Sequence, residues 1–262
     1  MRRRRTSPIQ IGEGELTALT RDLDEMHRAT LPTMHEAVAE WKEDLRSEGT
    51  SRRRFLMGTG AVVGGLVLAA CGDTDDDGVE TGGRRQGSAT ETVRPLTGDF
   101  AIAALAASIE NLAVNTYQAG LAGAAGGRLG EVPPAVTAFV TTVQRHHGEH
   151  AGAWNQVLTN GRRDTVSGVD LTVKGTVDPA FAQVRDVAGL ARLALDLENV
   201  AAATYLKSVS AIQNNGAMKV AASIQPVEMQ HAAILHFVLG EYPVPDSFAK
   251  EDGARPTTDQ IG

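Results

Sequence analysis

Two stretches of this chain have nearly the same sequence, and this internal repeat constrains the fold more than any other feature. Residues 102–117 and 190–205 align at a constant offset of 88, and eight of their sixteen positions are identical. The matches include Glu110 with Glu198. Alanines recur around each Glu at intervals of three and four residues, which is the spacing of one helix face. The repeat therefore predicts two equivalent helices, each with a carboxylate on an apolar face.

A second pair of matching segments follows the repeated helices. Each copy places a Gln, then a His or a Glu, then a His three residues apart, so the three share one helix side. The two triplets are Gln144, His147 and His150, and Gln225, Glu228 and His231. A Glu from each of two helices, combined with such a triplet from each of two more, is how a four-helix bundle builds an internal metal site. The candidate ligands are therefore Glu110, His147, His150, Glu198, Glu228 and His231.

The composition limits the classes of function open to the chain. Its 262 residues have a formal net charge of −7, which argues against general binding to nucleic acid. Aromatic residues are few, and abundant Ala and Gly suit closely packed helices better than a β-sandwich. Cys71 is the only cysteine, which excludes an intrachain disulfide and a zinc site made of thiolates.

Residues 51–71 resemble a bacterial export signal. Arg52 and Arg53 stand in the sequence Ser-Arg-Arg-Arg-Phe-Leu-Met, which is similar to a twin-arginine translocation signal. The next sixteen apolar residues include four glycines, and they are fewer than the roughly 20 that a transmembrane helix needs. They end in Leu-Ala-Ala-Cys, which resembles a lipobox. The resemblance implies export by the twin-arginine translocase, cleavage before Cys71, and a lipid on Cys71 that anchors the protein to the outer face of the cell membrane.

The segments on either side of this signal suggest no chemistry. Residues 1–50 have apolar residues at helical spacing, and they are either a cytoplasmic leader or a tract upstream of a later translation start at Met26 or Met34. Residues 72–98 are rich in Asp, Gly, Thr and Ser, which predicts a flexible tether. Because the tether separates them from the predicted core, we expect the bundle to fold without residues 1–98.

Four long apolar-periodic segments follow the tether. Their patterns predict helices over about 99–124, 133–159, 183–213 and 217–240, with a tail over 241–262. The first two and the last two are joined by short connections, so each pair should form an antiparallel hairpin. Residues 161–182 carry β-like fragments and are long enough to cross the whole bundle. The predicted fold class is all-α, a four-helix bundle over 99–240 with one long crossover.

These features together resemble the ferritin-like superfamily over about residues 98–240, especially its exported bacterial members. The resemblance implies two metal ions, with one ligand pair for each and a shared bridge. The implied sets are Glu110 with His150, Glu198 with His231, and Glu228 as the bridge. This chain has His147 where the family has a second bridging Glu. Neutral imidazole does not bridge two ions as a carboxylate does, so we expect one of the two sites to be weak.

Four further residues are expected beside the ligands: Tyr117, Tyr205, Gln144 and Gln225. The two Tyr residues lie two helical turns beyond the acids, either as donors to the carboxylates or redox-active neighbours, or as ordinary packed aromatics. The two Gln residues are expected to orient ligands. By helical geometry, His146 and Glu149 lie away from the ligand stripe, so we expect both to be exposed, with His146 as an outer ligand at most.

Two classes of function fit this pattern. The first is a metal protein that performs oxygen or peroxide chemistry or handles iron, since carboxylates and imidazoles suit iron or manganese, and also zinc. The second is a metal-free helical bundle that serves as an envelope scaffold or binding module. The sequence assigns no catalytic residue, and metal content distinguishes the two classes.

Overall fold

The structure is a computed structural model that describes residues 11–63 and 96–262. Its helices in these ranges are α1 (Glu13–Val63), α2 (Asp99–Ala125), α3 (Pro134–Asn160), α4 (Leu171–Gln183), α5 (Val187–Ala211) and α6 (Asn215–Leu239). The described residues contain no β-strand and one isolated β-bridge, between Asp170 and Ile261. The predicted all-α class is confirmed.

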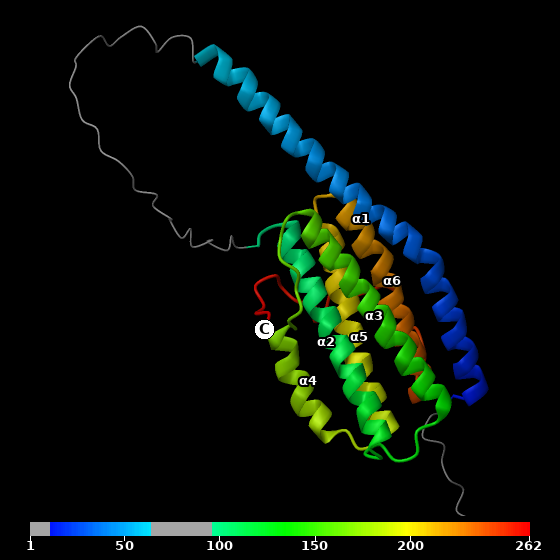
Figure 1. Ribbon diagram of the computed structural model, residues 1–262. Coiled ribbons are helices and arrows are strands. Elements are labelled where there is room, and N and C mark those ends of the chain that lie inside the picture. Colours follow the sequence, from blue (N-terminus) through cyan, green and yellow to red (C-terminus); the bar gives the residue numbers. More distant parts are fainter. Residues whose placement is uncertain (1–10, 64–95) are drawn as a thin grey trace, which may run out of the picture.

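Helices α2, α3, α5 and α6 form the predicted four-helix bundle (Figure 1). The short connections make α2 with α3 and α5 with α6 antiparallel hairpins, and α2 also packs on α5. Local sequence explains where these helices begin and end. The side chain of Asn214 accepts the backbone N–H groups of Gly216 and Ala217 at the start of α6, and Gly240 ends α6 in the left-handed conformation (φ 75°).

Two hydrophobic clusters fill the bundle, one toward each end. The first includes Phe139, Val143 and Leu235, and the second includes Trp154 and Ile224. Alanines at the helix contacts let the backbones approach closely between them. The candidate ligands lie between the two clusters along the helices, so the fold places its buried polar residues at mid-bundle.

The crossover between α3 and α5 contains helix α4 over part of the range where β-like fragments were expected. The side chain of Asp170 accepts the N–H of Val173 at 2.9 Å and begins α4, while Val173 and Val177 lie one turn apart and are buried. In a helix capped by Asp170, Val173 and Val177 lie on the same face, and that face is buried. The β-like interpretation is therefore wrong for this segment. The C-terminal tail returns to this crossover, where Val169 and Gly262 exchange backbone hydrogen bonds of 2.8 and 3.1 Å.

Helix α1 packs along α3 and α6 as a fifth long helix (Figure 1). One stripe of its side chains is buried: Leu16, Thr20, Leu23, His27, Met34, Ala37, Val38 and Trp41. The expectation that the tether separates residues 1–98 from the core is therefore wrong for residues 16–41. Its apolar residues, spaced by three, four or seven positions, need a partner surface, and the α3–α6 face supplies it.

The predicted export signal lies beyond this packed part. Residues 51–63, with Arg52 and Arg53, belong to the section of α1 that extends away from the bundle (Figure 1). Cys71 and most of the predicted tether lie outside the described residues. Among the helices of residues 11–63 and 96–262, none is both long and apolar enough to cross a membrane.

Candidate metal centre

The structure brings all six candidate ligands together in the middle of the bundle. Glu110 comes from α2, His147 and His150 from α3, Glu198 from α5, and Glu228 and His231 from α6. Each side chain is at most 1 % exposed. Burying so many ionisable groups costs free energy unless they are paired with one another or with a cation. Their position therefore calls for a chemical reason.

The six residues form two overlapping groups whose ligand atoms lie within 4.8 Å of one another. One group is Glu110, His147, His150 and Glu228, and the other is His147, Glu198, Glu228 and His231. In the first, the Nδ1 atom of His150 lies 2.9 Å from Oε1 of Glu228. In the second, Nδ1 of His231 lies 3.2 Å from Oε2 of Glu198 and 3.3 Å from Oε2 of Glu228. Two adjacent cation positions with a shared carboxylate fit this arrangement.

His147 is the other shared residue, and its two ring nitrogens face different groups. Nδ1 lies 2.7 Å from Oε2 of Glu110, while Nε2 lies 3.2 Å from Oε1 of Glu198. The ring therefore lies between the two carboxylates that the repeat makes equivalent. One nitrogen can bind a cation while the other donates its proton to the opposite Glu.

Unsatisfied buried atoms show that the centre fits a metal. Both carboxylate oxygens of Glu228 and Nδ1 of His150 are buried without a hydrogen-bond partner. Such atoms cost free energy unless something else satisfies them. Carboxylate oxygens and imidazole nitrogens converging on one point are the ligand set of iron, manganese or zinc.

The cluster holds opposite charges close together when no metal compensates it. Burial lowers the pKa of His150, but the close carboxylates of Glu110 and Glu228 outweigh it and raise that pKa to about 9. Burial raises the pKa of Glu110, yet the charge of His150 and the hydrogen bond from His147 bring it down to about 2. Against burial, the nearby carboxylates likewise raise the pKa values of His147 and His231. A metal ion must therefore displace protons from these rings.

The two tyrosines cross between the repeated helices. The hydroxyl of Tyr117 on α2 donates to Oε1 of Glu198 on α5, and that of Tyr205 on α5 donates to Oε1 of Glu110 on α2 at 2.5 Å. Burial, followed by the neighbouring carboxylate, raises the pKa of both hydroxyls, so each remains a donor. These contacts fix the orientation of the two acids. Of the alternatives that the sequence left open for the tyrosines, the hydrogen bonds are those of donors to carboxylates.

A family model for the ferritin-like domain matches residues 98–241, more than half of the chain. The chain belongs to the ferritin-like family. Searches of curated proteins and of solved structures found no match. The matched range covers the four bundle helices and begins after α1, so α1 is an addition to the ferritin-like domain in this chain.

Two predicted neighbours do not reach the centre of this ferritin-like domain. Gln144 donates to the carbonyl oxygen of Val114 and to Gln118, and Gln225 lies 3.0 Å from the sulfur of Met229. Both Gln residues lie toward the outside of the bundle. The expectation that they orient ligands is wrong, because the i and i+3 spacing that groups them with the ligands drifts around the helix over two steps.

Two buried histidines were missed as parts of the centre. His146 was expected to be exposed, but it is 0 % exposed because α1 covers that side of α3. His27, on α1, is 2 % exposed and lies among the histidines of the ferritin-like domain. Burial lowers the pKa of His27 to about 3, so its ring is neutral. A signal existed in the sequence, since His27 continues the helical stripe of Leu16 and Leu23.

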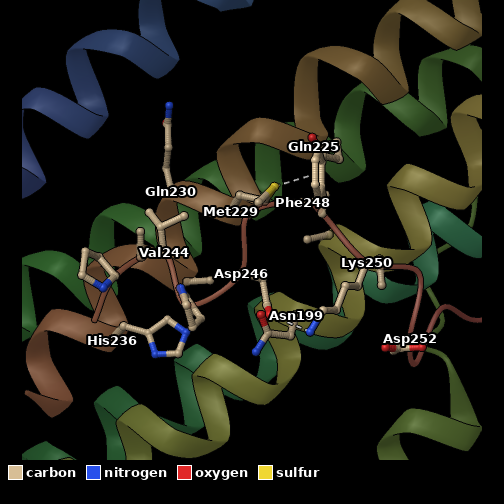
Figure 2. Close-up of a pocket in the computed structure, with 17 residues that line it drawn as sticks. Asn199, Gln225, Met229, Gln230, His236, Val244, Asp246, Phe248, Lys250 and Asp252 are labelled. Atoms are coloured by element: carbon tan, nitrogen blue, oxygen red, sulfur yellow. Dashed lines mark hydrogen bonds and ion pairs between the residues drawn. The ribbon is translucent and has the colours of Figure 1, made fainter. Parts of the chain in front are cut away.

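One cavity between described residues lies away from the centre. It has a volume of about 510 Å³ between α5, α6 and the C-terminal tail (Figure 2), and none of the six candidate ligands lines it. Its walls include Asn199, Met229 and Phe248. The residues that could hold a metal ion thus lie in the packed middle of the bundle and not in this open pocket.

Proposed function

We propose that this ferritin-like protein binds iron, as one or two ions, at the six-residue centre. The observation that carries the proposal is the pair of ligand groups that share His147 and Glu228, together with the unsatisfied oxygens of Glu228. Manganese and zinc accept the same donors and are the alternatives. Iron held there would supply redox chemistry toward oxygen or peroxide, or would itself be the cargo.

The residues of the chain have defined tasks in this proposal. Glu110 and His150 would hold one ion, and Glu198 and His231 would hold the other. Glu228 belongs to both ligand groups and would be shared. The surrounding tyrosines hold the outer carboxylate oxygens by hydrogen bonds, and the hydrophobic clusters on either side keep water away. Such support for the ligands is needed because the geometry of a metal site depends on the groups that orient its ligands.

Metal content of the full chain tests this function. The protein from iron-supplemented cells should carry between one and two equivalents of iron, and added Fe²⁺ should raise the melting temperature of the metal-free form, because a ligand of the folded state stabilises it. Glu228→Ala should remove most of the metal. Glu36→Ala on the exposed face of α1 makes the same change in net charge and should retain it. A full chain that binds neither iron, manganese nor zinc would overturn the proposal.

A metal-free scaffold is the competing function, and one observation favours it. The three imidazoles of the centre lie within ion-pair distance of its carboxylates, so the cluster compensates part of its own charge. In that case Glu228→Ala should change stability without any metal-dependent difference. Melting with and without Fe²⁺ separates the two functions.

We further propose that the chain is exported and lipid-anchored at the outer face of the cell membrane. The support is the sequence of residues 51–71 alone. Cys71→Ser should release the protein from the membrane or block its processing, and joint replacement of Arg52 and Arg53 by Lys should stop export. A Cys71→Ser protein that keeps its mature mass and its membrane association would exclude the lipid anchor. Cleavage before Cys71 would also remove α1 from the bundle.

A further inference from the structure

Two of the candidate ligands, His150 and His231, turn their Nε2 atoms away from the centre toward a second layer of imidazoles. Nε2 of His150 lies 3.1 Å from Nε2 of His27, and Nε2 of His231 lies 3.1 Å from Nδ1 of His146. His27 and His146 stack face to face, with ring centroids 3.8 Å apart and planes 11° apart. Each inner imidazole on this side therefore has one outer imidazole of its own.

Each outer imidazole ends on a carboxylate near the surface. Nδ1 of His27 lies 3.3 Å from Oε2 of Glu149, and Nε2 of His146 lies 3.3 Å from Oδ1 of Asp24. Arg145 binds both of these carboxylates. The result is two parallel chains of the same composition: carboxylate, outer imidazole, inner imidazole, centre.

The internal repeat shows why one outer imidazole has to come from α1. Helices α3 and α6 align at an offset of 81, which pairs His147 with Glu228 and His150 with His231. The same offset pairs His146 with Val227. The second half of the repeat thus lacks the outer imidazole of the first half, and His27 occupies the equivalent place beside His150.

We propose that α1 is part of the metal centre, and that His27 and His146 are positioning residues that hold His150 and His231 with Nδ1 toward the metal and Nε2–H outward. This inference rests on the proposed metal binding. An imidazole bound through Nδ1 keeps a proton on Nε2, which needs a buried acceptor. The facing nitrogens of the neutral outer rings accept that proton. The other ring nitrogen of His146 is hydrogen-bonded to Asp24, and that of His27 lies at 3.3 Å from Glu149 without a hydrogen bond. Metal-bound histidines commonly depend on such a partner for orientation and basicity.

The contacts of α1 hold His27 at a fixed position. Near the start of α6, a Cβ on Gly216 would lie 2.6 Å from the carbonyl oxygen of Ala37 and 2.6 Å from the backbone nitrogen of Trp41, so only Gly permits this close approach. Lys219 pairs with Glu40 at 2.5 Å. On the N-terminal side of His27, Leu16 and Leu23 are buried in the core. Because α1 is thus docked on both sides of His27, the outer imidazole is preorganised before metal binds.

The full chain loaded with Co²⁺, which has visible absorption bands and shifts nearby proton resonances, tests this role. His27→Ala should weaken the binding of one of the ions by roughly 10- to 100-fold, the usual loss of affinity when the partner of a ligand is removed, and should speed the release of that ion to excess EDTA. The shifted Nε2–H resonance of His150 should then exchange rapidly with solvent, while that of His231 stays slow. A purely structural role for His27 does not predict a change confined to one ligand.

Three further variants make the result decisive. His35→Ala, on the exposed side of the same helix, should match the parent chain. His27→Gln retains an acceptor and should recover most of the slow release. His27→Ala with Val227→His moves the imidazole from α1 to its repeat-related position and should also recover it. Release at the parent rate from His27→Ala overturns the inference while leaving metal binding intact, whereas a parent chain that binds no Co²⁺, Fe²⁺ or Zn²⁺ overturns both.

Discussion

The two sides of the centre are closed in different ways. On the α2–α5 side the repeat closes the site by itself, since Tyr117 and Tyr205 each cross to the Glu of the other half. On the α3–α6 side the repeat is broken twice, by His147 against Glu228 and by His146 against Val227. There an added helix, α1, covers the site and contributes His27. A duplicated helix pair can therefore supply the common scaffold while an appended helix adapts one face.

This difference bears directly on export. A chain cleaved before Cys71 keeps the whole tyrosine side but loses α1, and with it Asp24 and His27. Its α3–α6 face, with His146, His150 and His231, would then face solvent or a new partner. On the proposal of export, the cleaved chain would thus have a different centre from the chain with α1, and the mass of the protein in the cell shows which of the two is present.

Removal of α1 is expected to have the largest effect. Leu16, Leu23, Met34 and Trp41 are at most 3 % exposed, and full burial of such a side chain contributes about 1.5–3 kcal/mol. Together they supply a large part of the roughly 5–15 kcal/mol that keeps a domain folded. A chain that starts at Leu96 should unfold at a much lower urea concentration than the full chain, as followed by circular dichroism.

Point variants on α1 provide the matched comparison. Leu23 is 1 % exposed and Met26 is 49 % exposed on the same helix. Leu23→Ala should cost about 2–5 kcal/mol, and Met26→Ala should stay within about 0.5 kcal/mol. Equal urea midpoints for the two variants would show that α1 does not pack on the bundle in solution.

The repeat in the sequence accounts for most of what could be predicted. Equivalent positions predicted the four bundle helices and the six residues that the structure brings together, because a helix converts spacing into a shared face. The repeat gave no information on α1, which has no counterpart. The prediction for His146 was wrong for the same reason. Its side of α3 is covered by α1, which lies more than a hundred residues earlier in the chain. In the sequence, the only sign of this long-range packing is the apolar stripe on α1, which has no partner among the predicted helices.

The charge pairing in the metal-free centre predicts a pH dependence on the histidine side. The pKa of His150 is raised from 6.5 to about 9. Its stabilising contribution is therefore fully present below pH 6.5 and is lost as the pH rises through 9. The metal-free chain should lose stability from pH 6 to pH 10, as measured by urea unfolding, and His150→Gln should flatten that profile. A metal-loaded chain should show the opposite trend over the lower part of this range, since metal requires the unprotonated ring. Greater stability of the metal-free parent at pH 10 than at pH 6 would contradict this account.

Replacing His147 by Glu, the residue at the equivalent position 228 of the repeat, should allow the centre to bind two metal ions fully. His147→Glu adds a fourth carboxylate, which balances two divalent ions in charge and can bridge them. Iron content should rise toward two equivalents, with the weaker ion bound about tenfold more tightly, a change of roughly 1.4 kcal/mol. The same variant should destabilise the metal-free chain, because it buries another negative charge without a cation. Titration of the metal-free variant with Fe²⁺ under anaerobic conditions measures both affinities, and a lower stoichiometry than in the parent would show that His147 is itself an indispensable ligand.

Substitution of the tyrosines on the α2–α5 side should have smaller effects, and the two substitutions should lower the free energy of unfolding by different amounts. Tyr117→Phe removes one hydrogen bond to a charged acceptor, which contributes about 1.5–3 kcal/mol. Tyr205→Phe removes the equivalent bond and also leaves Nε1 of Trp154 without its acceptor, which lies 2.8 Å away. An unsatisfied buried donor adds about 1–3 kcal/mol, so Tyr205→Phe should be the more destabilising by about 1 kcal/mol at least. Urea unfolding of the metal-free variants measures this difference.

The double variant Tyr205→Phe with Trp154→Phe is the control, because it should remove the extra cost of the unsatisfied indole N–H. Equal stabilities of the two single variants would show that the tyrosine side keeps the symmetry of the repeat in energy as well as in geometry.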